Sequence, residues 1–363
     1  MPLHQAAVTP APCRPLCRPL RRPLRRPLCH SLRAALNAAS AVAALALLAL
    51  GHSSTVQAQD WPQSGKTLRI LSPFPPGGTA DQLARLIGAR LSQQTGVVAV
   101  VDNRPGGSTL IAVNELKRAA PDGYTVLYTV TGTTSQLPHL YAKSPVDPFN
   151  DFTPLGLFAF NQLVLTIPPS LPAKTVKELV EYARANPGKM NYASFGNGSF
   201  PHIVSELLKA NTGIEMTHVP FKGGADAGRA VMSGEVQLLF DAPVTGINNA
   251  RGGKLRALAS TGPNKVSVPG MTIGLPTMAE AGFPGFDVPG LEQLLGPPGM
   301  PRALADKVNA EIMKIAQLPE IRDIYVRNGF EFVASNTAEH ARVIRDNYER
   351  WGAIIRKTGI KLD

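Results

Sequence analysis

The sequence predicts an α/β protein with two lobes, because short apolar runs of strand length alternate along the chain with stretches of helical periodicity. Two extended segments, residues 155–168 and 287–298, lack a helical period and are flanked by proline, so each is expected to cross between the lobes. Residues 302–356 are helical in pattern throughout and predict a helical C-terminus. The runs expected to form strands are residues 68–71, 97–101, 124–130, 190–194, 236–240 and 255–259.

The first candidate strand ends in a glycine turn that leads into a helix. Residues 70–81 read Ile-Leu-Ser-Pro-Phe-Pro-Pro-Gly-Gly-Thr-Ala-Asp, in which the prolines end the strand and the glycines permit positive φ. Thr79 or Asp81 is expected to cap a helix whose N-terminus attracts a carboxylate or phosphate. An ordinary strand-to-helix loop, with Asp81 as a stabilising N-terminal carboxylate, is the alternative. The turn itself comprises Pro75, Pro76, Gly77, Gly78 and Thr79.

Three further helices are expected in the middle of the chain. Thr175-Val-Lys-Glu178 is a capping box, and its helix should end near the Asn-Pro-Gly sequence at residues 186–188. The other two helices are expected at residues 199–210 and 226–233.

The N-terminal segment has the pattern of an exported protein. An apolar run at residues 41–50 follows a group of arginines and precedes the small-x-small sequence Val56-Gln57-Ala58, which predicts a secretory signal cleaved near Ala58. Ahead of it, the proline- and arginine-rich repeat at residues 13–28 is expected to be a disordered leader. Residues 1–58 are therefore expected to be absent from a soluble mature chain that begins near Gln59.

Composition excludes several classes of function for that mature chain. Cys13, Cys17 and Cys29 all precede the expected cleavage site, which leaves no disulfide, reactive thiol or lipid-anchored cysteine. No pair of histidines or carboxylates has metal-ligand spacing, so no metal and no cofactor are expected. The net charge of +11 falls to +4 once the seven arginines of residues 1–58 are removed, which argues against a nucleic-acid partner.

Two exported α/β lobes joined by two crossovers describe a periplasmic binding protein. The chain resembles the substrate-binding receptors of tripartite tricarboxylate transporters, often called Bug receptors, over essentially the whole mature length. Six motifs in the right order carry this resemblance. They are PFPPGGTAD at 73–81, DNRPGG at 102–107, APDGYTVL at 120–127, YASFGNGS at 192–199 with His202 after it, VPFKGG at 219–224, and LPTMAEAG at 275–282.

The resemblance implies a type II periplasmic binding protein of the Venus-flytrap kind, with one lobe from residues 59–160 and 287–363 and the other from 161–286. Such a receptor is monomeric, carries no catalytic residues, and closes on a small carboxylate in the periplasm. It then delivers the acid to the membrane subunits of a tripartite tricarboxylate-type transporter. A receptor that presents the same acid to a membrane sensor has the same fold and remains an alternative.

The resemblance also implies that the first glycine turn, Pro75 to Thr79, grips one carboxylate of the ligand, and it implies a set of further contacts. His202 has a structural or capping hydrogen bond as its alternative role, and Lys222 has that of a solvated loop charge. Asp241 is expected to orient waters or to accept a hydrogen bond from the ligand. The full set comprises Thr131, Thr133, Ser194, Gly196, Asn197, Ser199, His202, Lys222, Gly223 and Asp241.

A secreted hydrolase is the competing class. Ser194, His202 and Asp241 follow the chain order of an α/β-hydrolase triad, but the glycines two residues either side of a nucleophilic serine are missing.

Overall fold

The computed structural model describes residues 61–77, 79–266 and 274–362, and for Thr79 it describes the backbone alone. The expected leader, signal sequence and cleavage site lie outside the described residues, as does Gly78. None of the helices in the described ranges is both long and apolar enough to cross a membrane.

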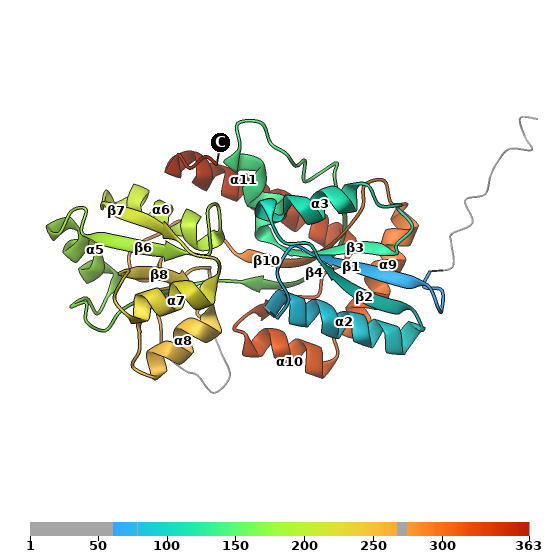
Figure 1. Ribbon diagram of the computed structural model, residues 1–363, viewed down its shortest axis with the longest axis horizontal. Helices are drawn as coiled ribbons and strands as arrows, with labels where there is room; N and C mark the ends of the chain where they lie inside the picture. Colours follow the sequence, from blue (N-terminus) through green and yellow to red (C-terminus); the bar gives the residue numbers. More distant parts are fainter. Residues whose placement is uncertain (1–60, 78, 267–273, 363) are drawn as a thin grey trace, which may run out of the picture. The chain divides into compact units, whose positions relative to one another are not determined.

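The first sheet has six strands in the order β11-β4-β10-β3-β1-β2 (Figure 1). β1 pairs in parallel with β2 and β3, whereas β10 runs antiparallel to both β3 and β4. Its strands are β1 (Thr67–Ser72), β2 (Val98–Asn103), β3 (Thr125–Val130), β4 (Thr153–Asn161), β10 (Gly290–Gly296) and β11 (Glu331–Phe332).

Helices pack on both faces of this sheet because successive strand residues point to opposite sides. Ile70 packs into the core that α2 shares with α9, whereas Leu71 packs with the buried face of α3. Figure 1 shows α2 and α3 on opposite sides of β1. The helical segments here are α2 (Thr79–Thr95), the 3-10 turn η1 (Gly107–Thr109), α3 (Leu110–Lys117), the π-helix η2 (Gly132–Gln136), α4 (Leu137–Leu140), α9 (Arg302–Ala316), α10 (Pro319–Arg327) and α11 (Thr337–Thr358).

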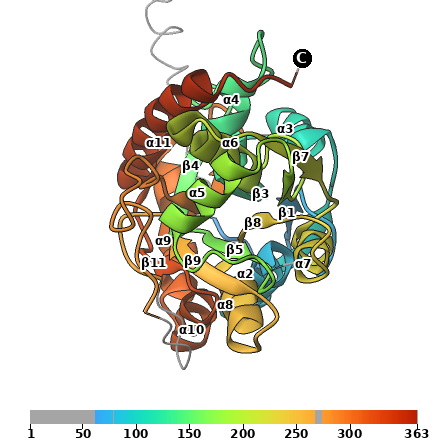
Figure 2. The same cartoon turned by 90° about the vertical axis from the view of Figure 1, so that its left-hand side faces the viewer.

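The second sheet has five strands in the order β7-β6-β8-β5-β9. Tyr192 packs against α5 and α6, and the next residue, Ala193, packs against α7, so this sheet too is covered on both faces (Figure 2). The elements are β5 (Val164–Ile167), α5 (Val176–Ala185), β6 (Met190–Ser194), α6 (Phe200–Thr212), β7 (Met216–Pro220), α7 (Gly224–Met232), β8 (Leu238–Asp241), α8 (Pro243–Arg251) and β9 (Arg256–Ser260).

All six predicted strands and the predicted capping box are present. Thr175 is the N-cap of α5, and its Oγ1 accepts the Glu178 N–H at 3.1 Å. The two predicted crossover segments contain strands: the first holds most of β4 and all of β5, and the second holds β10. β5 and β10 run antiparallel to their neighbours, so the sheets are mixed and not built from parallel units alone. The lobe boundaries themselves stay a prediction.

Candidate functional site

The first loop is held in shape by a buried carboxylate. Asp81 Oδ2 accepts the Gly77 N–H at 2.9 Å and the Arg85 Nε–H at 3.0 Å, and its Oδ1 accepts from Asn103 Nδ2 at 2.8 Å. Asp81 is 3% exposed. Burial on its own raises the pKa of Asp81, but the hydrogen bonds from Arg85, Gly77 and Asn103 outweigh that effect and lower it. Asp81 therefore stabilises the turn at the start of α2, as expected if it is a stabilising N-terminal carboxylate and not a ligand contact.

The middle of the loop between β1 and this carboxylate is open to solvent. Pro75, Pro76 and Gly77 are exposed, and Gly77 has φ of +92°, a left-handed conformation that favours glycine. The loop runs directly into α2, a helix of 17 residues. The described part of the 75–79 loop therefore lies at the N-terminus of α2, where the helix dipole favours an anion.

A second loop, residues 194–199, follows β6 and also leads into a helix N-terminus. The Ser194 Oγ accepts the Gly196 N–H at 3.1 Å, and the Ser199 Oγ donates to the Gly196 carbonyl at 2.7 Å. Gly196 has φ of +119°, which again favours glycine. Asn197, at the tip of the loop, is exposed. Three of the sequence-predicted residues are therefore joined in one hydrogen-bonded turn.

Two histidines lie beneath this loop. His202 Nδ1 accepts the Gly198 N–H at 2.9 Å, so His202 makes the structural hydrogen bond that was its alternative role. His218 Nε2 lies 2.6 Å from the Ser194 Oγ. Sequence analysis missed His218 because β7 was not among the predicted strands; the position precedes the VPFKGG motif by one residue, and that is the signal that could have found it.

The loop after β7 lies beside the 194–199 loop. The Phe221 N–H donates to the Ser194 carbonyl at 3.1 Å, which connects the two segments. Gly223 is the N-cap of α7, and Lys222 before it is exposed and forms no ion pair with any described residue. An exposed lysine without an ion-pair partner is available to bind an anion. Contact of Lys222 and Gly223 with a ligand stays a prediction.

Thr131 and Thr133 occupy the turn after β3, and both hydroxyls have partners within the protein. The Thr131 Oγ1 accepts the Leu291 N–H, and the Thr133 hydroxyl lies 2.7 Å from that of Thr129. Both threonines are buried, at 2% and 0% exposed. The expectation that these hydroxyls contact a ligand stays a prediction, and each would have to exchange or share its present partner.

Asp241 ends β8 and is 1% exposed. Its Oδ1 accepts the Ala242 N–H at 2.8 Å, and its Oδ2 has no hydrogen-bond partner among the described residues. Burial raises the pKa of Asp241 to about 6, although hydrogen bonds from Thr245 and Ala242 oppose the change. The carboxylate lies at the same sheet edge as Ser194, because β6 and β8 are parallel neighbours.

The comparisons with known proteins decide the family. The model of the tripartite tricarboxylate transporter family receptor matches residues 83–360. The chain belongs to this receptor family. A protein from the tcbD-tcbE intergenic region of Pseudomonas sp. (strain P51) is 33% identical over 285 residues, which is 78% of this chain and 83% of that protein.

Solved structures of related receptors agree with the fold. Rpa4515 of R. palustris, solved with adipate, has 32% identity and a TM-score of 0.74, and the match covers 83% of this chain and 99% of that one. MatC from Rhodopseudomonas palustris, solved with bound malate, has 27% identity and a TM-score of 0.71 over 80% of this chain and 99% of that one. The predicted two-lobed periplasmic binding protein fold and the predicted receptor family are confirmed.

Receptors of this family bind solutes, and the hydrolase triad is not assembled in this chain. His202 faces the Gly198 amide, and within the described part of the chain the carboxylate of Asp241 forms no hydrogen bond with either histidine. Ser194 and His218 do lie at the distance of a nucleophile and a base, but Ser194 is 0% exposed and its Oγ already accepts an amide. The described residues also contain no group of three or more side chains suited to a metal ion.

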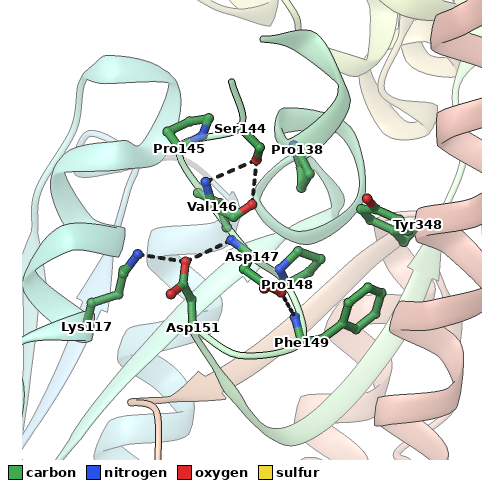
Figure 3. Close-up of a pocket in the computed structure, with 10 residues that line it drawn as sticks. All are labelled: Lys117, Pro138, Ser144, Pro145, Val146, Asp147, Pro148, Phe149, Asp151 and Tyr348. Carbon is green, nitrogen blue, oxygen red and sulfur yellow. Dashed lines mark hydrogen bonds and ion pairs between the residues drawn. The ribbon is translucent and has the colours of Figure 1, made fainter. Parts of the chain in front are cut away.

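A surface hollow of about 520 Å³ is lined by residues of α3, α4, α11 and the segment 144–151 (Figure 3). Lys117 and Asp151 form an ion pair of 2.7 Å at one side of it, and Phe149 and Tyr348 lie at the other. No sequence-predicted site residue lines it. The hollow is therefore not evidence for or against a ligand site at the loops after β1 and β6.

Proposed function

We propose that this receptor captures a small organic carboxylate with the loops at residues 75–79 and 194–199 and delivers it to the membrane subunits of a tripartite tricarboxylate-type transporter. One observation supports a carboxylate as the class of ligand. The amides of Phe195, Asn197 and Phe200 have no hydrogen-bond partner among the described residues; the first two lie in the loop between β6 and α6, and Phe200 is the first residue of α6. Free amides at a helix N-terminus favour a carboxylate.

The relatives support the same ligand class. Rpa4515 is described with adipate and MatC with malate, and each acid carries two carboxylates. In this chain the arginine that follows the first loop, Arg85, is already paired with Asp81 at 3.0 Å. Recognition by backbone amides and hydroxyls therefore suits the site better than recognition by an arginine clamp.

Calorimetry on the purified protein tests the ligand class. Adipate and malate are titrated first, followed by shorter dicarboxylates, with the corresponding diamide as the uncharged control. At a ligand concentration 100 times the dissociation constant, the protein should also gain roughly 2.7 kcal/mol of stability in a thermal-shift assay. Binding of the diamide as tightly as the diacid would reject recognition of the carboxylate.

Delivery to a transporter is tested in the source organism. Removing the gene for this chain should abolish uptake of the radiolabelled acid identified by calorimetry, and restoring the gene should restore uptake. Normal uptake combined with loss of an acid-induced transcriptional response would favour the sensing alternative.

We also infer that the mature protein is periplasmic and begins near Gln59. The apolar run and the small-x-small site support export and cleavage. Cell fractionation with mass measurement of the purified product should recover a chain without residues 1–58 in the periplasm. A product that retains them in the membrane fraction would contradict the inference.

A further inference from the structure

The 194–199 loop rests on a stacked pair of imidazoles. The rings of His202, from α6, and His218, from β7, have centroids 3.9 Å apart and planes inclined by 8°. The Tyr192 ring is also stacked on the pair, at 4.9 Å and 19° from His218 and at 6.3 Å and 26° from His202. His202 is 9% exposed and His218 is half-buried. The two histidines thus form one packed unit below the loop.

Each imidazole holds one end of the loop. The Gly198 N–H donates to His202 Nδ1 at 2.9 Å, close to the start of α6. At the other end, His218 Nε2 lies 2.6 Å from the Ser194 Oγ, which in turn accepts the Gly196 N–H at 3.1 Å. The stacked pair therefore sets the path of the backbone between Ser194 and Gly198.

The direction of one of these bonds requires a neutral ring. A backbone N–H can only donate, so His202 Nδ1 must offer a lone pair to Gly198. Protonation of His202 at Nδ1 would place two N–H groups against each other and break this contact. The contact of His218 makes no such demand, because the Ser194 hydroxyl donates to the Gly196 carbonyl at 3.1 Å and its oxygen can accept a hydrogen from His218 Nε2.

Three further groups face the pair. The Tyr192 hydroxyl donates to Glu206 Oε1 at 2.5 Å, and Lys209 Nζ lies 2.7 Å from the same oxygen. Burial lowers the pKa of His202, Glu206 opposes this change, and Lys209 adds to it. Burial, the neighbouring His202 and Lys209 lower the pKa of His218 to about 4 against the opposing effect of Glu206. Both rings are therefore neutral at pH 7.

We propose that His202 and His218 are positioning residues for the 194–199 loop, and that His202 holds the loop in its binding conformation only while its imidazole is neutral. Capture of the carboxylate by this loop then weakens on acidification. The effect on affinity rests on the proposed function, because it requires the loop to contact the acid. The effect on the loop itself does not require any ligand.

Nuclear magnetic resonance on the ligand-free chain tests the positioning role directly. The Gly198 amide and the His202 ring nitrogens are followed from pH 7.5 to pH 4.5, with circular dichroism to show that the fold persists. The Gly198 amide should shift with the same midpoint as His202. A Gly198 resonance that is unchanged while His202 titrates would overturn the proposal, whatever the ligand proves to be.

Calorimetry with adipate and malate tests the effect on binding. His202→Asn places an acceptor oxygen where Nδ1 stands but does not titrate. Between pH 7.5 and pH 5.0 the wild-type affinity should fall about tenfold more than that of His202→Asn. Protonation of the acid itself affects both proteins equally and therefore cancels when the two losses are compared. His202→Leu, which lacks the acceptor, should bind at least tenfold more weakly already at pH 7.5.

His139→Asn is the matched control. His139 lies on α4, where its Nε2 is 2.9 Å from the Tyr348 carbonyl, and it has no part in the loop. This variant should retain the wild-type pH profile. Equal pH dependence of binding by the wild type and by His202→Asn would overturn the proposal. Failure of both proteins to bind either acid at pH 7.5 would instead overturn the proposed function. In that case the titration of the Gly198 amide decides whether His202 positions the loop.

Discussion

Glu292 Oε1 accepts a hydrogen bond from Asn161 Nδ2 at 2.8 Å, and this bond joins the two strands through which the chain leaves and re-enters the first sheet. Asn161 is the last residue of β4, and Glu292 lies near the start of β10. The Tyr128 hydroxyl donates to Glu292 Oε2 at 3.2 Å and lies 3.0 Å from the Tyr325 hydroxyl. A buried polar network therefore lies at the point where the chain passes between the two sheets.

Glu292→Gln should remove a pH dependence of stability. Burial raises the pKa of Glu292 to about 7 from 4.5, against the opposing hydrogen bonds of Asn161 and Tyr128. Because the folded-state pKa is the higher one, this group's contribution is fully present below pH 4.5 and is lost as pH rises through about 7. The free energy of unfolding of the wild type should fall by on the order of 3 kcal/mol relative to Glu292→Gln between pH 4.5 and pH 8.

Urea unfolding at each pH measures this difference. Glu331→Gln, on the edge strand β11 of the same sheet, is the exposed control and should keep the wild-type profile. If the free energy of unfolding changes with pH in the same way for the wild type and Glu292→Gln, then Glu292 has the same pKa in the folded and the unfolded chain.

His340→Asn should change the acid side of the stability profile. His340 Nδ1 accepts the Gly156 N–H at 3.0 Å and its Nε2 faces the Gln293 Oε1 at 2.9 Å, so the ring is neutral with its proton on Nε2. Burial lowers the pKa of His340 to about 3 from 6.5. The stabilisation is therefore complete above pH 6.5 and declines as pH falls. Between pH 6.5 and pH 4 the wild type should lose about 3 kcal/mol more than the variant. Chemical unfolding at four or five pH values is sufficient, and identical slopes would argue against a buried neutral imidazole.

Asp81→Ala should destabilise the protein through the first loop. The variant leaves the Gly77 and Asn103 donors without their acceptor, which costs about 2–3 kcal/mol for a buried carboxylate. Since the pKa of Asp81 is lowered from 3.8 in the folded protein, this stabilisation is present at neutral pH and is lost as pH falls below 3.8. Asp346→Ala breaks a surface pair with Arg342 in which the carboxylate side chain is 49% exposed, and it should cost less than about 0.5 kcal/mol. Similar losses for the two variants would remove Asp81 as the group that holds the turn.

Gly196→Ala should weaken ligand binding, whereas Gly188→Ala should not. Both glycines have positive φ, +119° and +72°, so alanine is strained at each by about 1 kcal/mol. Neither added methyl group meets an atom closer than 3.7 Å. Gly196 lies in the 194–199 loop, and its variant should bind the acid about tenfold more weakly, or 1.4 kcal/mol. Calorimetry on both variants separates a local effect on the loop from a general loss of stability, and equal affinities would exclude Gly196 from the site.

Much of the candidate site followed from the sequence because its features are local. The glycine turn at residues 75–79, the helix that follows it and the capping box at Thr175 depend on residues within four or five positions of one another. The contacts of His202 and the loop around Gly196 are also short-range, which is why both positions were found. His218 was missed because its partner, Ser194, is 24 residues away and the two meet only through the pairing of β6 with β7.

The sequence by itself determined the α/β class, the six strands, the helical C-terminus and the family, because periodicity and ordered motifs are written along the chain. Only the tertiary structure decided the antiparallel course of β5 and β10, the internal partners of Thr131 and Thr133, and the burial of Glu292. These depend on which segments pack against each other. Burial raises the pKa of Glu292, and the hydrogen bonds that oppose this come from Asn161 and Tyr128, more than 100 positions away, so no local pattern specifies the environment of this carboxyl group.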